Sequence, residues 1–142
     1  MDSRVEIALK GNEFKRVLEK HFDAIKKKYE LKKVDIEVLL YLSECGDKDT
    51  PTDIYISLGL NRGHVSQAID SLIKKGYVQS IADSNDRRIA HYAILESAQD
   101  IIAKISLLKN EFDKKIFDGL SQEEITQYKR ITIKIMQNLK KM

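Results

Sequence analysis

Residues 50–76 read TPTDIYISLGLNRGHVSQAIDSLIKKG and carry the signals that decide the fold. Thr50 can cap a helix, and Pro51 suits the first helical position because its missing N–H would have no partner there. Gly59 is suited to end this helix, and Asn61 is suited to cap the next one. Two short helices separated by a three- or four-residue turn predict a helix-turn-helix.

The second of these helices, residues 61–75, has an apolar stripe made of Val65, Ala68 or Ile69, and Leu72 with Ile73. The other side chains at its start are polar, so an amphipathic helix exposes them. A recognition helix needs an arginine and short hydrogen-bonding side chains there, because its first residues meet base edges in the major groove. The candidate DNA-contacting residues of this helix are Asn61, Arg62, Gly63, His64, Ser66 and Gln67. The alternative is a solvated face that contacts nothing.

The sequence after this helix is typical of a β-hairpin. Two β-prone segments, residues 77–82 and 89–95, flank the polar turn DSNDRR at residues 83–88. Such a tip projects arginines, which are favoured in a narrow minor groove where negative potential is concentrated. The candidate DNA-contacting residues of the tip are Asp86, Arg87 and Arg88. The alternative is a hairpin salt bridge without a DNA partner.

Helices with long apolar stripes are predicted near both ends of the chain, over residues 5–29, 101–116 and 125–139. A small winged helix between them has too little core to cover all of these stripes. The end helices therefore pack on each other, on the centre or on another copy. A closed twofold homodimer is the economical solution, and a monomeric helical bundle is the alternative.

The length of 142 residues suits one compact domain. We expect residues 34–95 to form a winged helix-turn-helix lobe, and residues 1–30 and 97–142 to form helices for dimerisation. Within the lobe, residues 34–42 fit either a buried strand or a core helix, and acidic residues near the start favour the helix. The predicted fold class is therefore mainly α with a small β-hairpin wing.

Composition narrows the classes of protein. Hydrophobic residues make up 42% of the chain and charged residues 33%, which suits a soluble protein with a core. No apolar run is long enough for a membrane span, and the charged N-terminus is unlike a secretory signal. The single cysteine, Cys45, fits a reducing compartment, so we expect a cytoplasmic protein. The net charge of +3 is compatible with nucleic acid but too mild to argue for it.

Catalytic motifs are lacking in this sequence. His21, His64 and His91 lie in different predicted elements, and the sequence contains no HExxH, paired CxxC or Gly-rich phosphate loop. Residues 71–74 match Ser-x-x-Lys, but they lie within the amphipathic helix and fit ordinary surface positions. We therefore predict that the protein is not an enzyme and has no catalytic residue, cofactor or metal site.

Three features resemble the MarR (multiple antibiotic resistance regulator) family. They are Val65-Ser66 in the recognition helix, the exit Leu72-Ile73-Lys74-Lys75-Gly76, and Asp86-Arg87-Arg88 in the wing. The match is strongest over residues 34–95, and chain length and helix order agree with the family throughout. The resemblance implies a bacterial winged-helix transcription factor that dimerises through its N- and C-terminal helices and binds pseudopalindromic promoter DNA.

The same resemblance implies roles for single residues. Asp86 would orient Arg88 for the minor groove, and Arg87 would contact phosphate. The protein would be a homodimeric repressor of double-stranded DNA sites, released by a small aromatic or phenolic effector. The candidate effector-lining residues are Tyr29, Tyr41 and Tyr55. The alternative function is a protein-interaction module that uses the winged-helix scaffold without binding DNA.

The sequence departs from the family pattern at three places. Gln79-Ser80 stands where many members have an arginine, and residues 95–99 replace the usual Leu-Thr-x-x-Gly. Both departures bear on phosphate anchoring rather than on the fold. Cys45 lies near the end of the second predicted helix, whereas well-known oxidation sensors of the family carry theirs in the first. We therefore interpret Cys45 as a small buried hydrophobic residue.

Overall fold

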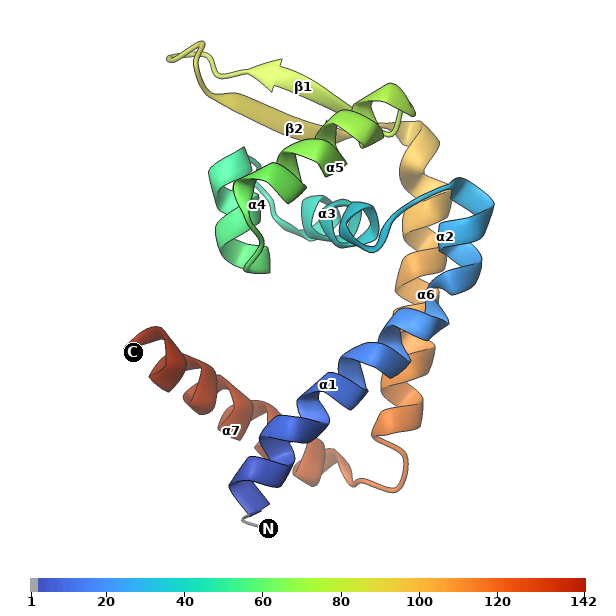
Figure 1. Cartoon of the computed structure of the whole chain (residues 1–142), viewed down its shortest axis with the longest axis vertical. Coiled ribbons are helices and arrows are strands. Elements are labelled where there is room, and N and C mark those ends of the chain that lie inside the picture. Colours follow the sequence, from blue (N-terminus) through green and yellow to red (C-terminus); the bar gives the residue numbers. More distant parts are fainter. Residues whose placement is uncertain (1–2) are drawn as a thin grey trace. The chain divides into compact units, whose positions relative to one another are not determined.

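The computed structural model describes the backbone of residues 3–142 and the side chains of residues 11 and 13–142. Its helices are α1 (Ser3–His21), α2 (Asp23–Tyr29), α3 (Lys33–Glu44), α4 (Pro51–Leu58), α5 (Arg62–Lys74), α6 (Gln99–Ile116) and α7 (Gln122–Lys140). Its strands are β1 (Val78–Ala82) and β2 (Ala90–Ile94) (Figure 1). The chain divides into two compact units, of which the first ends at Lys109 and the second spans Asn110–Met142. The predicted fold class, mainly α with a hairpin, is confirmed.

The helix-turn-helix is built by the local signals that the sequence carries. Thr50 Oγ1 accepts a hydrogen bond from Asp53 N at 3.2 Å, and the Asp53 carboxylate accepts one from Thr50 N at 3.3 Å. This reciprocal capping box begins α4 with Pro51 in its first turn. Gly59 ends α4 at φ 64°, a left-handed conformation that glycine adopts without steric cost.

The core of the first unit lies where α3, α4, α5 and β1 meet. Ile73, which was predicted to share the apolar stripe of α5, is 38% exposed, so that part of the prediction is wrong. Val65, Ala68, Ile69 and Leu72 form the buried face of α5, as predicted. They pack with buried side chains of α3, α4, β1 and α6. The largest of these are Val38, Leu39, Ile54, Val78, Ile101 and Ile105. Because the buried face of α5 is turned into this core, the opposite face is left for solvent.

The segment 34–42, which fitted a strand or a helix, lies within α3. Its helix begins where Asp35 Oδ2 accepts a hydrogen bond from Lys32 N at 2.8 Å. Asp35 is only 3% exposed, so this bond satisfies a carboxylate that has little access to water. The prediction of a helix is confirmed.

The prediction of one continuous helix over residues 5–29 is wrong. The helix ends at His21 and a new one, α2, begins at Asp23, with Phe22 between them at φ −93° and ψ −1°. Phe22 and the buried Ile25 both pack against the core of the first unit. The turn at Phe22 brings these two apolar side chains onto the core. The chain therefore breaks the helix here, although the apolar periodicity of the sequence continues.

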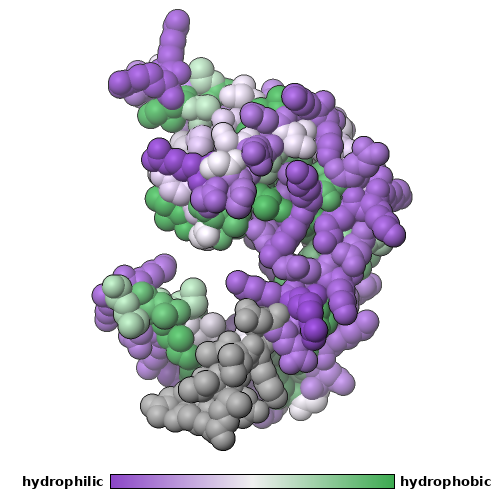
Figure 2. Space-filling view, viewed as in Figure 1, coloured by the Kyte–Doolittle hydropathy of each residue, from purple (hydrophilic) through white to green (hydrophobic). Residues whose placement is uncertain are grey.

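The predicted hairpin is confirmed. Strands β1 and β2 pair antiparallel, with Val78 opposite Ile94 and Ala82 opposite Ala90. We call β1, β2 and the tip of residues 83–89 the wing. The wing lies alongside α5 (Figure 1), and in Figure 2 its tip is a strongly hydrophilic projection.

The second unit is described by itself. Ser121 and Glu124 form the capping box of α7, with Glu124 N donating to Ser121 Oγ at 3.1 Å. No residue of α7 is buried, although the helix is rich in apolar side chains, whose surface is visible in Figure 2. Its large exposed apolar residues are Tyr128, Ile131, Ile133, Ile135, Met136 and Leu139. Among the described residues, no helix combines the length and the apolar character that crossing a lipid bilayer would need.

Candidate DNA-binding surface

The start of α5 is an exposed polar surface on a helix whose other face is buried. All six candidates from this helix are exposed, while Val65 between them is 1% exposed. The candidates are Asn61, Arg62, Gly63, His64, Ser66 and Gln67. The structure therefore brings them together on one surface, as the apolar stripe predicted.

Asn61 and Gly63 have a local role in this surface. Asn61 Oδ1 accepts a hydrogen bond from His64 N at 2.8 Å, which caps α5. A Cβ added to Gly63 would lie 3.4 Å from that same oxygen. Asn61 thus sets the direction in which α5 begins, and Gly63 leaves room for the cap.

Arg62 is held against α4 by Tyr55. The Arg62 Nη2 donates a hydrogen bond to Tyr55 Oη at 3.1 Å, and the guanidinium carbon lies 5.2 Å from the ring centroid. The guanidinium group lowers the pKa of the Tyr55 hydroxyl. Tyr55 therefore belongs to the same surface as the start of α5, a placement that the sequence did not predict.

The wing tip fixes Arg88 through Asp86. The Asp86 carboxylate accepts hydrogen bonds from Arg88 N at 3.0 Å, from Nε at 3.1 Å and from Nη2 at 3.1 Å. The paired guanidinium group lowers the pKa of Asp86. The Arg88 side chain is nonetheless 90% exposed, and Arg87 beside it is exposed as well. The tip therefore presents two cations, of which one has a fixed direction.

The base of the wing contains a group of three side chains that the sequence analysis missed. His91 Nδ1 is 2.5 Å from Asp49 Oδ1, and His91 Nε2 is 2.7 Å from Asp83 Oδ1. Asp83 Oδ2 also accepts hydrogen bonds from Asn85 N and Asp86 N, each at 2.9 Å. Asp49 and His91 are 42 residues apart, so no local pattern could have indicated this contact.

Lysines lie beside the same face of α5. A surface hollow next to the helix is lined by Lys32, His64, Gln67 and Ser71. A second hollow is lined by Gln67, Lys74 and Lys75. Lys75 Nζ donates to the Glu30 carbonyl oxygen, whereas Lys32 and Lys74 add exposed positive charge to this face. None of these three lysines was a candidate DNA-contacting residue in the sequence.

The three candidate effector tyrosines hydrogen-bond to different partners. Tyr29 Oη is 2.6 Å from Lys104 Nζ, which lowers the pKa of that hydroxyl. Tyr41 Oη donates to the Lys48 carbonyl oxygen at 2.7 Å, and Tyr55 accepts from Arg62. Each tyrosine thus has a separate polar partner in the first unit.

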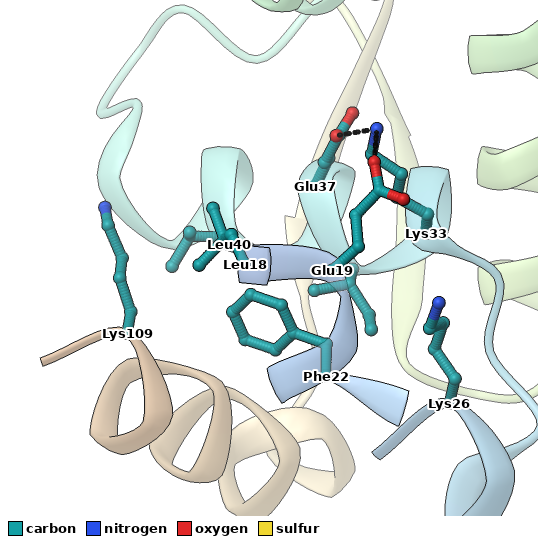
Figure 3. Close-up of a pocket in the computed structure, with 9 residues that line it drawn as sticks. Leu18, Glu19, Phe22, Lys26, Lys33, Glu37, Leu40 and Lys109 are labelled. Carbon is teal, nitrogen blue, oxygen red and sulfur yellow. Dashed lines mark ion pairs between the residues drawn. The ribbon is translucent and has the colours of Figure 1, made fainter. Parts of the chain in front are cut away.

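An apolar cavity of about 130 Å³ lies elsewhere in the first unit, between α1, α2, α3 and α6 (Figure 3). Its lining consists of Leu18, Glu19, Phe22, Lys26, Lys33, Ile36, Glu37, Leu40 and Lys109. Lys33 Nζ pairs with Glu19 at 2.5 Å and with Glu37 at 3.8 Å. The cavity therefore combines an apolar wall with charged groups, and the three candidate tyrosines are not among its lining residues.

Cys45 is half-buried rather than buried as predicted. It is the C-cap of α3, and its Sγ lies 3.6 Å from the Leu42 carbonyl oxygen. Burial, together with the charge of Asp49, raises the pKa of the Cys45 thiol. A raised pKa lowers the fraction of reactive thiolate.

Comparisons with known proteins agree with this arrangement. Residues 20–105 match the family described as transcriptional regulator SarA/Rot. The transcriptional repressor MprA of Escherichia coli K12 is 25% identical over 92 residues, which are 65% of this chain and 52% of MprA. The chain thus spans about half the length of that relative.

Two solved structures show the likeness in fold. A MarR protein from Peptoclostridium difficile has a TM-score of 0.80 and 21% identity, covering 98% of this chain and 89% of its own. Streptococcus pneumoniae FabT, solved in complex with DNA, has a TM-score of 0.77 and 20% identity, covering 99% of both chains. The expected resemblance to MarR-type regulators is confirmed.

Proposed function

Because this chain belongs to the SarA/Rot family of transcriptional regulators, we propose that it binds double-stranded DNA and represses transcription. In this proposal α5 enters the major groove and the wing reaches the adjacent minor groove. The observation that carries it is Arg88, oriented by Asp86 and 90% exposed at the tip of a wing beside α5. The protein would act in the cytoplasm, where promoter DNA is accessible.

The start of α5 would read base edges. Gln67 has the amide that pairs with adenine, and His64 and Ser66 can donate or accept hydrogen bonds. Arg62 suits guanine or a phosphate group, and its stacking on Tyr55 sets the direction of approach. Asn61 and Gly63 would act by shaping the first turn of the helix.

The wing would supply the second contact. Arg88 suits a narrow minor groove because its guanidinium group is attracted by the concentrated negative potential there. Asp86, which takes three hydrogen bonds from Arg88, would orient it rather than touch DNA. Arg87 would contact a phosphate group beside the groove.

The functional unit would be a homodimer. Tyr128, Ile131, Ile135 and Leu139 follow spacings of three and four along α7 and are each about half exposed. Burying an apolar side chain of this size contributes about 1.5–3 kcal/mol. A second copy that covers this face, and places two α5 helices on one side of DNA, predicts half-sites about 10 base pairs apart.

Release by a small effector is the finer part of the proposal. The cavity between α1, α2, α3 and α6 offers an apolar wall with Lys26 and Lys109 at its lining, which suits a small aromatic acid or phenol. Tyr29, Tyr41 and Tyr55 remain candidate contacts at their separate places. Thermal unfolding with and without benzoate tests this: a raised melting temperature that Leu40→Trp abolishes supports the cavity, and no shift contradicts it.

Selection of bound sequences from random duplex DNA tests the main proposal. The expected result is a pair of inverted half-sites about one helical turn apart, with affinity that falls steeply as salt increases. Light scattering on the same material should give the mass of a dimer. A protein that is retained by no duplex at low ionic strength would instead fit an interaction module built on a winged-helix scaffold.

A further inference from the structure

The contact between His91 and its two aspartates is a well-defined junction. The three side chains are only 22–28% exposed, so water competes weakly for their hydrogen bonds. A neutral imidazole carries a single N–H, whereas the imidazolium ion carries two. Both contacts are therefore charge-assisted hydrogen bonds only when His91 is protonated.

On the wing side, the junction continues to the arginine-bearing tip. Asp83 uses one carboxylate oxygen for His91 and the other for the backbone N–H groups of Asn85 and Asp86. Asp86 in turn holds Arg88. A change in the direction of the Asp83 carboxylate is therefore passed to the turn from which Arg88 projects.

On the other side, the junction reaches the helix-turn-helix. Asp49 directly precedes Thr50, the N-cap of α4, and its carbonyl oxygen accepts a hydrogen bond from Tyr92 N at 3.1 Å. Asp49 thus binds β2 through its backbone and through its side chain. This matters because a two-stranded hairpin is marginally stable by itself, so its direction depends on contacts with the rest of the fold.

We infer that His91 is a positioning residue for DNA binding, which fixes the wing to the helix-turn-helix by joining Asp83 to Asp49. This inference rests on the DNA-binding function proposed above. His91 does not touch DNA in this account. It sets where Arg88 stands relative to the start of α5, and both must meet the duplex together.

The surrounding charges make the junction sensitive to pH. Hydrogen bonds to Asp49, which has the larger effect, and to Asp83 raise the pKa of His91. The contact with His91 in turn lowers the pKa of Asp83. Across the sheet, the partner of His91 is the uncharged Ile81. Two titratable groups lie near the loop that contains Asp49. Tyr41 Oη donates a hydrogen bond to the Lys48 carbonyl oxygen, and the charge of Asp49 helps to raise the pKa of the Cys45 thiol. Asp86, the other carboxylate of the tip, is paired with Arg88.

The sign of the pH effect follows from these directions. The folded-state pKa of His91 lies above its ordinary value of 6.5. The junction is therefore complete below about pH 6.5 and weakens as the pH rises through the raised pKa. Asp83, whose pKa is lowered, stays ionised over this range, and the protonation of His91 decides the change.

The test combines His91→Gln with Arg88→Ala in a double-mutant cycle on selected duplex DNA. At pH 6, His91→Gln should weaken DNA binding about three- to tenfold. The loss of affinity caused by Arg88→Ala should be at least about threefold smaller in the His91→Gln background than in the wild type. A residue with a merely structural role would give additive costs. Because His91→Gln could misfold, Asp49→Asn serves as a second variant that keeps His91 in place, with unfolding curves checked for both.

The effect of His91 on the pH profile of DNA affinity must be separated from the effects of the other histidines. His64 is a second histidine and lies on the proposed DNA-binding surface, so the profiles of the His91 and Asp49 variants are compared in a His64→Gln background. The fall in affinity between pH 6 and pH 8.5 should persist with His91 and shrink without it. His21→Gln, in α1, is the matched control and should change neither affinity nor profile.

Failure of the inference and failure of the proposed function give different results. If the wild type binds DNA and the His91 and Asp49 variants bind equally well, His91 does not position the wing. Additive losses of affinity in the double mutant would lead to the same conclusion. If the wild type binds no DNA, the proposed function fails. In that case NMR still tests the junction. The amide chemical shifts of Asn85 and Asp86 should change over the same pH range as the ring signals of His91. Amide shifts that do not change with the His91 titration would overturn the inference.

Discussion

At the scale of single residues, the side chains of the wing tip should matter for DNA binding and contribute little to the free energy of unfolding. Asp86 and Arg88 form a forked ion pair, but the Arg88 side chain is 90% exposed. Exposed ion pairs contribute little to the free energy of unfolding because water and salt screen them. A substitution at Arg88 should therefore alter the proposed DNA contact of the tip and leave the fold largely as it is.

We expect Arg88→Ala to weaken DNA binding by about 1–3 kcal/mol without changing the mass in solution or the melting temperature. Titration of labelled duplex by gel shift measures this, with Arg87→Ala as the matched neighbour. Arg87→Ala should reduce affinity uniformly across sequences and lower the salt slope by about one. A wild-type titration curve for Arg88→Ala would contradict the wing assignment.

Stability should depend on pH through the same junction that positions the wing. Because the pKa of His91 is raised in the folded state, its stabilising contribution is complete below about pH 6.5. That contribution is lost as the pH rises through the raised pKa. The difference in melting temperature between wild type and His91→Gln should therefore shrink from pH 5.5 to pH 8.5. A difference that stays constant or grows over this range would contradict the assigned protonation.

At the scale of elements, helix ends are fixed by side chains within one turn. Three side-chain caps begin helices: Thr50 with Asp53, Asn61 with the His64 N–H, and Ser121 with Glu124. The first two begin helices where the sequence predicted a start. These caps satisfy backbone N–H groups that have no partner within the helix. They are local, so they act in the same way whatever the rest of the chain does.

We expect Thr50→Ala to lower the free energy of unfolding by about 1 kcal/mol, because α4 loses its N-cap. Thr50→Ser keeps the hydroxyl acceptor and should stay close to wild type. Urea unfolding followed by circular dichroism measures both. Equal stabilities of the alanine and serine variants would mean that the cap does not hold α4.

At the scale of the whole molecule, α7 exposes a row of large apolar side chains. No residue of this helix is buried, and Ile131 and Ile135 are 48% and 54% exposed. Contiguous apolar surface of this kind marks an interaction site in soluble proteins. A second copy is the partner that the proposed function requires, because pseudopalindromic DNA is matched by twofold symmetry.

We expect Ile131→Asp to convert the proposed dimer to a monomer and to abolish DNA binding at concentrations where the wild type binds. Its charge would be buried without a partner in the interface. Gln137→Asp is the matched control, since helical spacing puts residue 137 opposite Tyr128 and away from the apolar row. Light scattering measures the mass, and a dimeric Ile131→Asp variant would contradict this role of α7.

Most of the fold could be predicted from the sequence, and the site could be predicted in part. The exposed start of α5 and the arginines of the tip followed from periodicity and turn composition. The lysines beside α5, the support of Arg62 by Tyr55 and the junction at His91 did not. These depend on which elements become neighbours, and periodicity carries no such information.

The sequence alone determined the helix-turn-helix, the hairpin and the polar row on α5, because caps, glycine turns and apolar spacing act within a few residues of each other. Only the tertiary structure decided the break at Phe22 and the meeting of Asp49, Asp83 and His91. In the first, packing of Phe22 and Ile25 on the core outweighed a continuous helix. In the second, groups 42 residues apart in sequence came within hydrogen-bond distance only because β2 is paired to the loop before α4.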